Sequence, residues 1–248
     1  MRSAIITVAG ISSRFNEGIP EEAKVLKAIY HEDDPKKTLL YHLLKKCSYA
    51  DRVIIVSGYK DESLRNYITT LDRDMREKIA VVYNEYFSDL SSGYSLYLGL
   101  KEAFKYSSDE ILFVEGDLDI DDESFDRVVN SNGNVLTFTY EPIYSDKAVV
   151  LYKDDKEKYR YAFNHSHGML HIESPFSCIL NSGQLWKFTD IEKLNDASDR
   201  FFSENKEGTN LCIIQNYLDQ DIQVEVLPLK RWTNCNTRDD YKTIKAYW

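Results

Sequence analysis

Two aspartates, one residue apart, follow an apolar run in the first half of the chain. Residues 111–114 form this run, and Asp117 and Asp119 come shortly after it, behind Glu115 and Gly116. In an open α/β sheet, ligands bind at the carboxyl ends of the parallel strands, where these aspartates would lie. Closely spaced hard oxygen donors at that edge suit Mg²⁺ carrying phosphates. The spacing therefore favours a metal and phosphate site at the end of this strand.

A loop of small residues follows the first apolar run of the chain. Residues 5–9 form the run, and the loop after it contains Gly10, Ser12, Ser13 and Arg14. Backbone N–H groups of such a loop can bind phosphates, and Arg14 adds a planar charged fork. The loop has neither the GxxxxGK[ST] spacing nor the GxGxxG spacing, so an ordinary strand-to-helix turn stays open as an interpretation. Lys24 could reach back over the same phosphates, although a solvated lysine is the alternative.

Apolar runs alternate with helical stripes through the first half of the chain. The runs predict buried strands at residues 5–9, 53–57, 79–83 and 111–114. Apolar residues at three-to-four spacing predict helices over 39–47 and 96–104, the second opened by a cap at Ser91 or Ser92. Strand, helix and strand at this spacing imply right-handed crossovers. We therefore expect an α/β fold, a single Rossmann-like three-layer domain with a mostly parallel mixed sheet.

The second half of the chain has a less regular pattern. We expect helices near 184–194 and 209–218, and strands at 135–140, 148–152, 171–180 and 222–227. The segment from Thr237 to Asp240 fits a capping box that opens a last helix ending near Tyr247. No internal repeat or low-complexity linker is present, so residues 1–248 are expected to form one domain.

Composition excludes several classes of protein. The formal net charge of −10 lacks the basic footprint of a general nucleic-acid binder, so an anionic ligand needs local cations, a helix N-terminus or a metal. The scattered cysteines form no CxxC pair, which predicts reduced thiols and a cytoplasmic location. The apolar runs are too short for a membrane span, and we expect no signal peptide.

Several short motifs follow one another in a specific order. They are A-G-x-S-S-R-F at 9–15, K-x-L-x-x-I at 24–29, a helix start at 38–40, and the segments 53–59, 84–86, 91–96, 115–117 and 232–240. In this order and spacing the chain resembles the nucleotidyltransferases of the glycosyltransferase-A-like fold. The likeness is greatest to bacterial cytidylyltransferases that activate phosphocholine or aminoalkylphosphonates for surface decoration. It extends over nearly the whole chain.

The resemblance implies a role for each matching residue. It makes Lys24 the charge-stabilising lysine and assigns the triphosphate loop to Gly10, Ser12, Ser13 and Arg14. It places further nucleotide-binding residues at Ala9, Gly58, Asn84, Ser91 and Ser92. Asp117 becomes a Mg²⁺ ligand, and Asn236 takes the second metal-binding position in the pattern W-x-x-x-[DN]-T-x-x-D. Asp119 is implied as an auxiliary ligand.

The resemblance also implies a reaction. A nucleoside monophosphate, with CTP favoured as its source, would pass to a small phosphorylated or phosphonate acceptor, with release of pyrophosphate and with Mg²⁺ as cofactor. Residues 1–130 would form the nucleotide-binding half and 131–248 the acceptor-binding half, and a homodimer is a possible assembly. Two positions depart from the family: Ser12 stands where glycine is usual, and Ala23 where proline is common.

Three alternatives stay open beside this interpretation. A sugar-1-phosphate nucleotidyltransferase would share the mechanism, and a glycosyltransferase of the same fold would use Asp117-Leu118-Asp119 as its D-x-D metal site. A catalytically weak nucleotide-binding module would fit Ser12. The histidine-containing segment 165–171 has no partners for a zinc site, so we expect a loop lining the acceptor pocket. Tyr152, Tyr159 and Tyr161 could form a wall for a trimethylammonium group.

Overall fold

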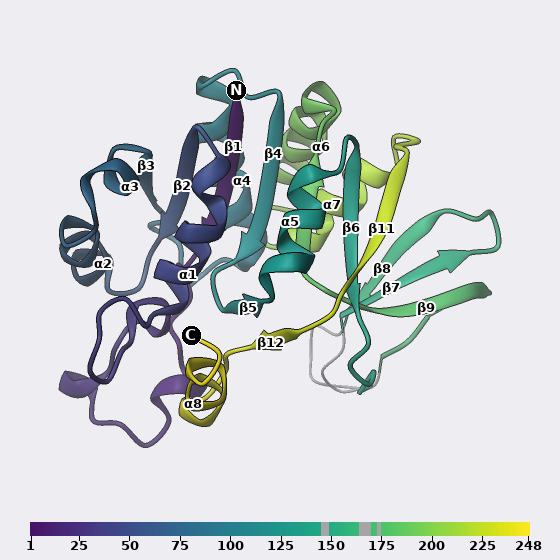
Figure 1. Cartoon of the computed structure of the whole chain (residues 1–248). Coiled ribbons are helices and arrows are strands. Elements are labelled where there is room, and N and C mark those ends of the chain that lie inside the picture. The colour runs from purple at the N-terminus through teal and green to yellow at the C-terminus, as the bar shows by residue number, and fades with distance from the viewer. Residues whose placement is uncertain (145–148, 164–169, 173–174) are drawn as a thin grey trace.

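The chain forms one continuous mixed sheet with helices on both faces (Figure 1). The structure is a computed structural model, and it describes residues 1–144, 149–163, 170–172 and 175–248. From edge to edge the strands are β3 (Ile79–Tyr83), β2 (Arg52–Ser57), β1 (Arg2–Thr7), β4 (Glu110–Glu115), β10 (Leu185–Phe188), β6 (Asn134–Thr139), β9 (Phe176–Ser182), β7 (Val149–Asp154) and β8 (Tyr159–Phe163), with β11 (Val224–Leu229) also paired to β6. A separate pair joins β5 (Leu118–Ile120) to β12 (Trp232–Asn234).

The helices divide between the two faces of the sheet. They are α1 (Leu39–Lys46), α2 (Asp61–Thr69), α3 (Arg73–Glu77), α4 (Ser92–Lys105), α5 (Asp122–Asn130), α6 (Ile191–Glu204), α7 (Asn210–Leu218) and α8 (Arg238–Lys245). Short 3-10 turns are η1 (Arg14–Asn16), η2 (Glu21–Ala23), η3 (Lys27–Ile29) and η4 (Cys47–Tyr49). One core contains side chains of α1, α2 and α5, and the other contains side chains of α4, α6 and α7.

Alternate residues of the central strands enter these two different cores. In β1, Ala4 and Ile6 belong to the core on the α1 side, whereas Ile5 belongs to the core on the α4 side. Successive side chains of a strand point to opposite faces, so a strand covered on both faces must be apolar throughout. Each such side chain contributes about 1.5–3 kcal/mol when it is fully buried. The predicted α/β fold class is therefore confirmed.

Strand direction determines where the loops of the first half meet. The strands β3, β2, β1 and β4 pair in parallel. The antiparallel β10 then lies between β4 and β6. Because parallel strands end at the same edge of a sheet, the segments that follow β1, β2 and β4 are brought together there.

The predicted helix over 184–194 is wrong. Residues Leu185–Phe188 form strand β10, and α6 begins only at Ile191. Lys187 looks like a solvated helix residue in the sequence, yet its side chain is 2% exposed and pairs with Glu110 at 2.8 Å. Its Nζ also donates to the backbone oxygens of Val129 and Ser131. Pairing with β4 on one side and β6 on the other outweighs the local helical pattern.

The other predicted elements of the second half differ from the structure mainly at their ends, and the strands β8 and β12 were not predicted. The strand expected at 171–180 is observed at Phe176–Ser182, and residues 173–174 lie outside the described part. The capping box is confirmed, because the Thr237 hydroxyl accepts from Asp240 N and the Asp240 carboxylate accepts from Thr237 N. The four cysteines of the chain are free, with Cys47 and Cys235 buried.

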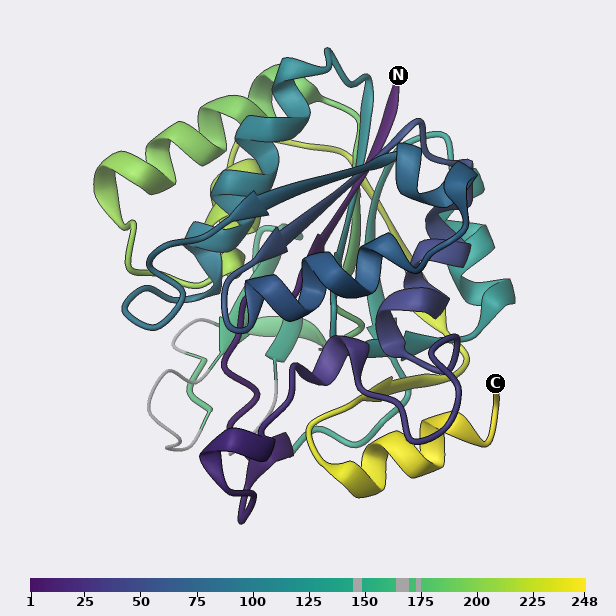
Figure 2. The same ribbon diagram turned by 90° about the vertical axis from the view of Figure 1, so that its left-hand side faces the viewer.

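A third, smaller core lies away from the sheet. It combines Phe15, Leu39, Cys235, Tyr241 and Ile244, with Tyr30 and Trp248 packed against it. These residues come from the first forty and the last fifteen positions, so α8 lies at the same end of the molecule as the segment after β1 (Figures 1 and 2). The C-terminal segment is thereby fixed beside the phosphate loop predicted from the sequence.

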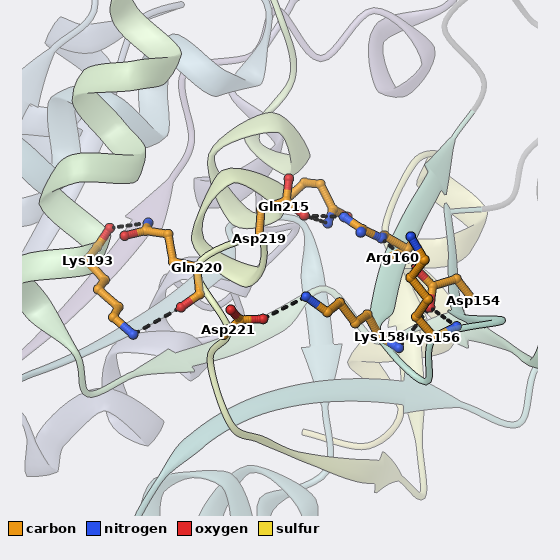
Figure 3. A network of polar contacts seen from close by, with 9 residues as sticks. All are labelled: Asp154, Lys156, Lys158, Arg160, Lys193, Gln215, Asp219, Gln220 and Asp221. Atoms are coloured by element: carbon orange, nitrogen blue, oxygen red, sulfur yellow. Dashed lines mark hydrogen bonds and ion pairs between the residues drawn. The ribbon is translucent and has the colours of Figure 1, made fainter.

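Ion pairs hold the β7–β8 hairpin against the end of α7 (Figure 3). Arg160 pairs with Asp154 at 3.1 Å and also with Asp219, and Lys158 pairs with Asp221 at 2.6 Å. The pairs Arg160–Asp219 and Lys158–Asp221 are partly exposed, so each contributes only about 0–1 kcal/mol, whereas Asp154 is buried. Together these ion pairs fix the orientation of the hairpin relative to α7, and we assign them no ligand-binding role.

Candidate active site

A cavity of about 290 Å³ lies at the carboxyl end of the parallel strands. The loop after β1 and the end of β4 both line it, as does the N-terminal turn of α4. Among its walls are Ala9, Gly10, Ser12, Ser91, Ser92 and Asp117, each of which the sequence predicts to bind nucleotide or metal. The small-residue loop after β1 and the acidic segment after β4, both predicted from the sequence, therefore face one cavity.

Gly116 allows the end of β4 to lie directly against the end of β1. Its N–H donates to the oxygen of Thr7 at 3.0 Å. A Cβ at this position would lie 2.4 Å from Val8 Cγ1 and 2.6 Å from Thr7 O, which no side chain tolerates. Glycine at 116 thus brings Asp117 close to the loop that begins at Ala9.

Asp117 forms an ion pair with Lys27, and both residues line the cavity. Lys27 Nζ lies 3.0 Å from Asp117 Oδ2, and the lysine side chain is 16% exposed. The second carboxylate oxygen of Asp117, Oδ1, is buried and has no hydrogen-bond partner among the described residues. Buried acceptors are normally satisfied, so this oxygen is open for a ligand.

Lys24, the lysine that the sequence indicated, lies elsewhere. It pairs with Glu21 at 2.6 Å and is not among the residues that line the cavity. The two glutamates before it, Glu21 and Glu22, favour such a local pair at this spacing. The sequence holds one signal for Lys27, which is that its two neighbours, Leu26 and Ala28, are apolar. In the structure both neighbours are buried.

A second cavity of about 170 Å³ adjoins the first through two shared residues, Ser12 and Lys27. Ser13, Arg14 and Asn236 also line it. Ser12 has φ +56°, in the left-handed region that favours glycine. The glycine usual in the resembled family is thereby explained, and in this chain a serine adopts the same backbone conformation.

Asn236 is held near Asp117 by backbone pairing. The strand β12 pairs antiparallel with β5, and Cys235 N–H donates to the oxygen of Asp117 at 2.8 Å. Asn236 N–H in turn donates to Asp240 at 2.9 Å, which fixes it at the start of α8. Its role as a metal ligand stays a prediction.

Asp119 has an environment that suits a structural role, and its predicted role as an auxiliary ligand stays a prediction. The side chain is almost fully buried, and Arg231 forms an ion pair with its Oδ2. Its Oδ1 accepts from Trp248 Nε1 at 3.1 Å. Because both oxygens are engaged on the α8 side of β5, Asp119 supports the fold rather than the cavity.

Glu115 is a cavity residue that sequence reasoning missed. It lies at the end of β4, and Asn210 Nδ2 donates to its Oε1 at 2.6 Å. Burial, and after it the negative charge of Asp117, raise the pKa of Glu115 from 4.5 to about 7. The sequence shows Glu115 beside Asp117 but does not show that α7 would cover it with Asn210.

Asn84 and Gly58 support the cavity walls. Asn84 is buried, donates to Ser95 Oγ at 3.0 Å and accepts from Tyr86 N–H at 2.9 Å. At Gly58, a Cβ would lie 2.8 Å from the oxygen of Ala9, so glycine lets the loops after β1 and β2 touch. Their predicted contact with nucleotide stays a prediction.

The second half of the chain gives little support for the acceptor-binding features predicted from the sequence. Tyr161 is buried, and its hydroxyl accepts from Trp186 Nε1 at 2.7 Å, so it is a core residue and not a cation-binding wall. Most of the histidine-containing segment, residues 164–169, lies outside the described residues. Across the described part, no group of three His, Cys, Asp or Glu residues could hold a metal by itself. None of the helices there has the length and apolar character to cross a membrane.

Solved structures similar to this chain are nucleotidyltransferases. The CTP:phosphocholine cytidylyltransferase of Streptococcus pneumoniae has a TM-score of 0.66 at 16% identity, over 99% of this chain and 98% of that one. The inositol-1-phosphate CTP transferase of T. maritima gives 0.66 at 17%, over 98% and 95%. A UDP-glucose pyrophosphorylase in complex with UDP-glucose gives 0.68 at 12%, over 100% and 98%. The fold predicted from the resemblance is confirmed.

Comparisons of the sequence identify a family but no function. No curated protein matches this sequence. A family model does match residues 23–248, which include Lys27, Asp117 and Asn236. The chain therefore belongs to the family described as "Domain of unknown function (DUF6564)".

Proposed function

We propose that this chain is a nucleotidyltransferase that transfers a nucleoside monophosphate from a nucleoside triphosphate to a small phosphorylated or phosphonate acceptor. The single observation that carries the proposal is the Lys27–Asp117 ion pair across a cavity that the loop after β1 also lines. A cation, a carboxylate with a free buried oxygen and a loop of backbone N–H groups together suit a polyphosphate.

The reaction needs no nucleophile from the protein. An oxygen of the acceptor phosphate, already ionised near neutral pH, attacks the α-phosphorus in line and forms the new P–O bond. The bond from the α-phosphorus to the bridging oxygen breaks, and pyrophosphate leaves with the electron pair. Lys27, Arg14 and the loop N–H groups neutralise the charge that develops on this leaving group, while the two adjoining cavities hold the reactants in line.

Mg²⁺ suits the oxygen donors of this site. Asp117 Oδ1 is an orphaned acceptor, and Asn236, whose side chain carries a carbonyl oxygen, lines the adjoining cavity. Mg²⁺ commonly takes one or two protein oxygens and completes its shell with phosphates and water, so a large cluster of carboxylates is not required. When bound there, it would neutralise phosphate charge during the displacement.

The nucleotide and the acceptor are proposed from the relatives. Two of the similar structures are a CTP:phosphocholine cytidylyltransferase and an inositol-1-phosphate CTP transferase, which favours CTP, whereas another is a UDP-glucose pyrophosphorylase. Phosphocholine and inositol 1-phosphate, named for the same relatives, are small phosphorylated acceptors. Residues 131–248 would bind the acceptor, and a homodimer and a cytoplasmic location stay predictions.

Pyrophosphate release tests the proposal. The purified chain is assayed with Mg²⁺, with each common nucleoside triphosphate, and with phosphocholine, phosphoethanolamine, aminoethylphosphonate or a sugar 1-phosphate. We expect release only when nucleotide, acceptor and metal are all present. Activity confined to sugar 1-phosphates would move the acceptor to the sugar class and keep the mechanism. No release with any pair, although nucleotide binds, would favour a catalytically weak binding module.

A D-x-D glycosyltransferase fits this chain less well. That activity would use Asp117 and Asp119 as its metal site, but both carboxylate oxygens of Asp119 are engaged, one by Arg231 and one by Trp248. Transfer of a sugar from a nucleoside diphosphate sugar, without pyrophosphate release, would nevertheless favour it.

A further inference from the structure

A buried asparagine joins the loop after β1 to the segment that carries Lys27. Asn16 closes η1, is 2% exposed and is not part of either cavity wall. Its Nδ2 donates to the oxygen of Ser12 at 3.1 Å and to the oxygen of Val25 at 2.8 Å. Its Oδ1 accepts from Val25 N–H at 3.1 Å. One side chain therefore bonds to both segments at once.

The chemistry of this position demands an amide. A carboxamide carries two N–H donors and an acceptor oxygen, which match two backbone carbonyls and one backbone N–H. An aspartate would turn an acceptor oxygen toward both carbonyls. A leucine would remove the side-chain partner of Val25 O and of Val25 N–H, whereas Ser12 O would keep its bond from the backbone N–H of residue 16. The three bonds also fix which end of the amide is nitrogen, since the reverse orientation would satisfy none of them.

The same connection continues from Ser12 to Lys27. Ser12 Oγ accepts from Lys27 N–H at 3.3 Å, so the backbone of Lys27 is held by the loop residue that Asn16 itself holds. Lys27 then begins η3 and extends its Nζ to Asp117. The position of the lysine relative to the loop thus depends on Asn16 at Val25 and on Ser12 at Lys27.

We propose that Asn16 is a positioning residue that holds Lys27 at Asp117 and couples it to the phosphate loop. It acts through Lys27 and does not touch the reacting groups. Its catalytic consequence rests on the function proposed above, whereas its effect on Lys27 does not. Two independent measurements can therefore separate a failure of this proposal from a failure of the proposed function.

The first measurement is the reactivity of Lys27 in the absence of nucleotide. Each protein is treated with a limiting amine-acylating reagent, and the modification of Lys27 and of Lys24 is followed by peptide mass spectrometry. In Asn16→Ala and Asn16→Asp we expect Lys27 to react at least about fivefold faster than in wild type, because its hold on Asp117 is loosened. Lys24, which precedes Val25 but whose Nζ is held by Glu21, should keep its rate.

Two variants calibrate the labelling. Asp117→Asn removes the ion-pair partner directly and shows the rate of a released Lys27. Asn134→Ala is the matched control, because Asn134 also bonds to backbone on two segments, donating to Gln223 O at 3.1 Å and accepting from Thr189 N–H at 2.8 Å, at the opposite end of the sheet. In Asn134→Ala, Lys27 should react at the wild-type rate. Circular dichroism and thermal unfolding establish that each variant is folded, and if Asn16→Ala does not fold, Asn16→Asp decides.

The second measurement is steady-state turnover. A displaced Lys27 weakens stabilisation of the leaving group, so we expect kcat of the Asn16 variants to fall at least about tenfold while KM for nucleotide stays within about threefold. A merely structural asparagine would leave Lys27 labelling and kcat of the folded variant unchanged, and that result would overturn the proposal. If wild type itself transfers no nucleotide, the proposed function fails, and the labelling result still decides the role of Asn16.

Discussion

Asp117, just before β5, and Asp119, within it, have opposite hydrogen-bonding environments. On the cavity side, Asp117 has one oxygen paired with Lys27 and one buried oxygen without a partner in the described part of the chain. On the side of α8, Asp119 has both oxygens engaged, by Arg231 and by Trp248. The two residues are two positions apart in sequence, so strand alternation alone would place them on one face. Asp117 precedes β5 whereas Asp119 lies within it, and their different partners come from how the surrounding segments fold.

This difference separates a residue that is open for a ligand from a residue that holds the fold. A fully bonded buried carboxylate leaves little capacity for a metal, and removing it leaves a charged partner unpaired. A buried carboxylate with a free oxygen is costly in the absence of ligand, and proteins keep such groups mainly at functional sites. Aspartate spacing alone cannot distinguish the two cases.

Loss of Lys27 should give the largest effect and tests the cavity side. In Lys27→Ala, Asp117 loses its cation and the leaving pyrophosphate loses a neutralising charge. We expect kcat for pyrophosphate release to fall by about 10²–10³-fold, the range found when one donor to a developing charge is removed. Turnover within about threefold of wild type would show that Lys27 is not the lysine of this site.

Loss of the Asp119 carboxylate should chiefly affect stability and tests the other side. Asp119→Ala leaves Arg231 without its buried partner and Trp248 Nε1 without an acceptor. We expect the free energy of unfolding to fall by about 3 kcal/mol, as for a broken buried ion pair. Urea denaturation measures the loss, and kcat per folded molecule should stay near wild type. A metal requirement altered more than stability would return Asp119 to the ligand set.

The sequence predicted the first half of the fold because its strands are buried on both faces. Runs such as 53–57 have no other stable environment, and the crossover rule then determines the parallel sheet. In the second half, Lys187 is buried by long-range partners, Glu110 and the end of α5, that no local pattern reveals. The predicted helix failed there for that reason.

The candidate site was predictable only in part, for a similar physical reason. Gly10, Ser12 and Asp117 follow strands directly, so their place at the carboxyl edge follows from topology. The choice between Lys24 and Lys27 depends on how the segment after η2 folds back, which Asn16 determines through backbone bonds. Glu115 and Asn210 meet only because α7 packs across the sheet edge.

Protonation of Glu115 should give a smaller, pH-dependent effect on the cavity side. Its pKa is about 7 when folded and 4.5 as a free side chain, so between these values the native state holds a proton that the unfolded state has lost. The free energy of unfolding should therefore decrease from about pH 5 to about pH 7 and then level off. Glu115→Gln removes this contribution. Urea midpoints across that range measure the slope, and equal slopes in both proteins would contradict the prediction.

Loss of Lys24 should give the smallest effect and completes the comparison between the two lysines. Lys24 is a partly exposed residue whose ion pair with Glu21 is local, and neither residue lies in a cavity wall. Surface pairs of this kind have little energetic consequence, so Lys24→Ala should change kcat by no more than about twofold and leave the unfolding midpoint nearly unchanged. Lys24→Ala and Lys27→Ala each remove one positive charge, so a comparison of the two variants tests only the position of that charge. A large loss of turnover in Lys24→Ala would mean that the segment 21–27 moves when nucleotide binds, and that the ion pair with Asp117 is then exchanged between the two lysines.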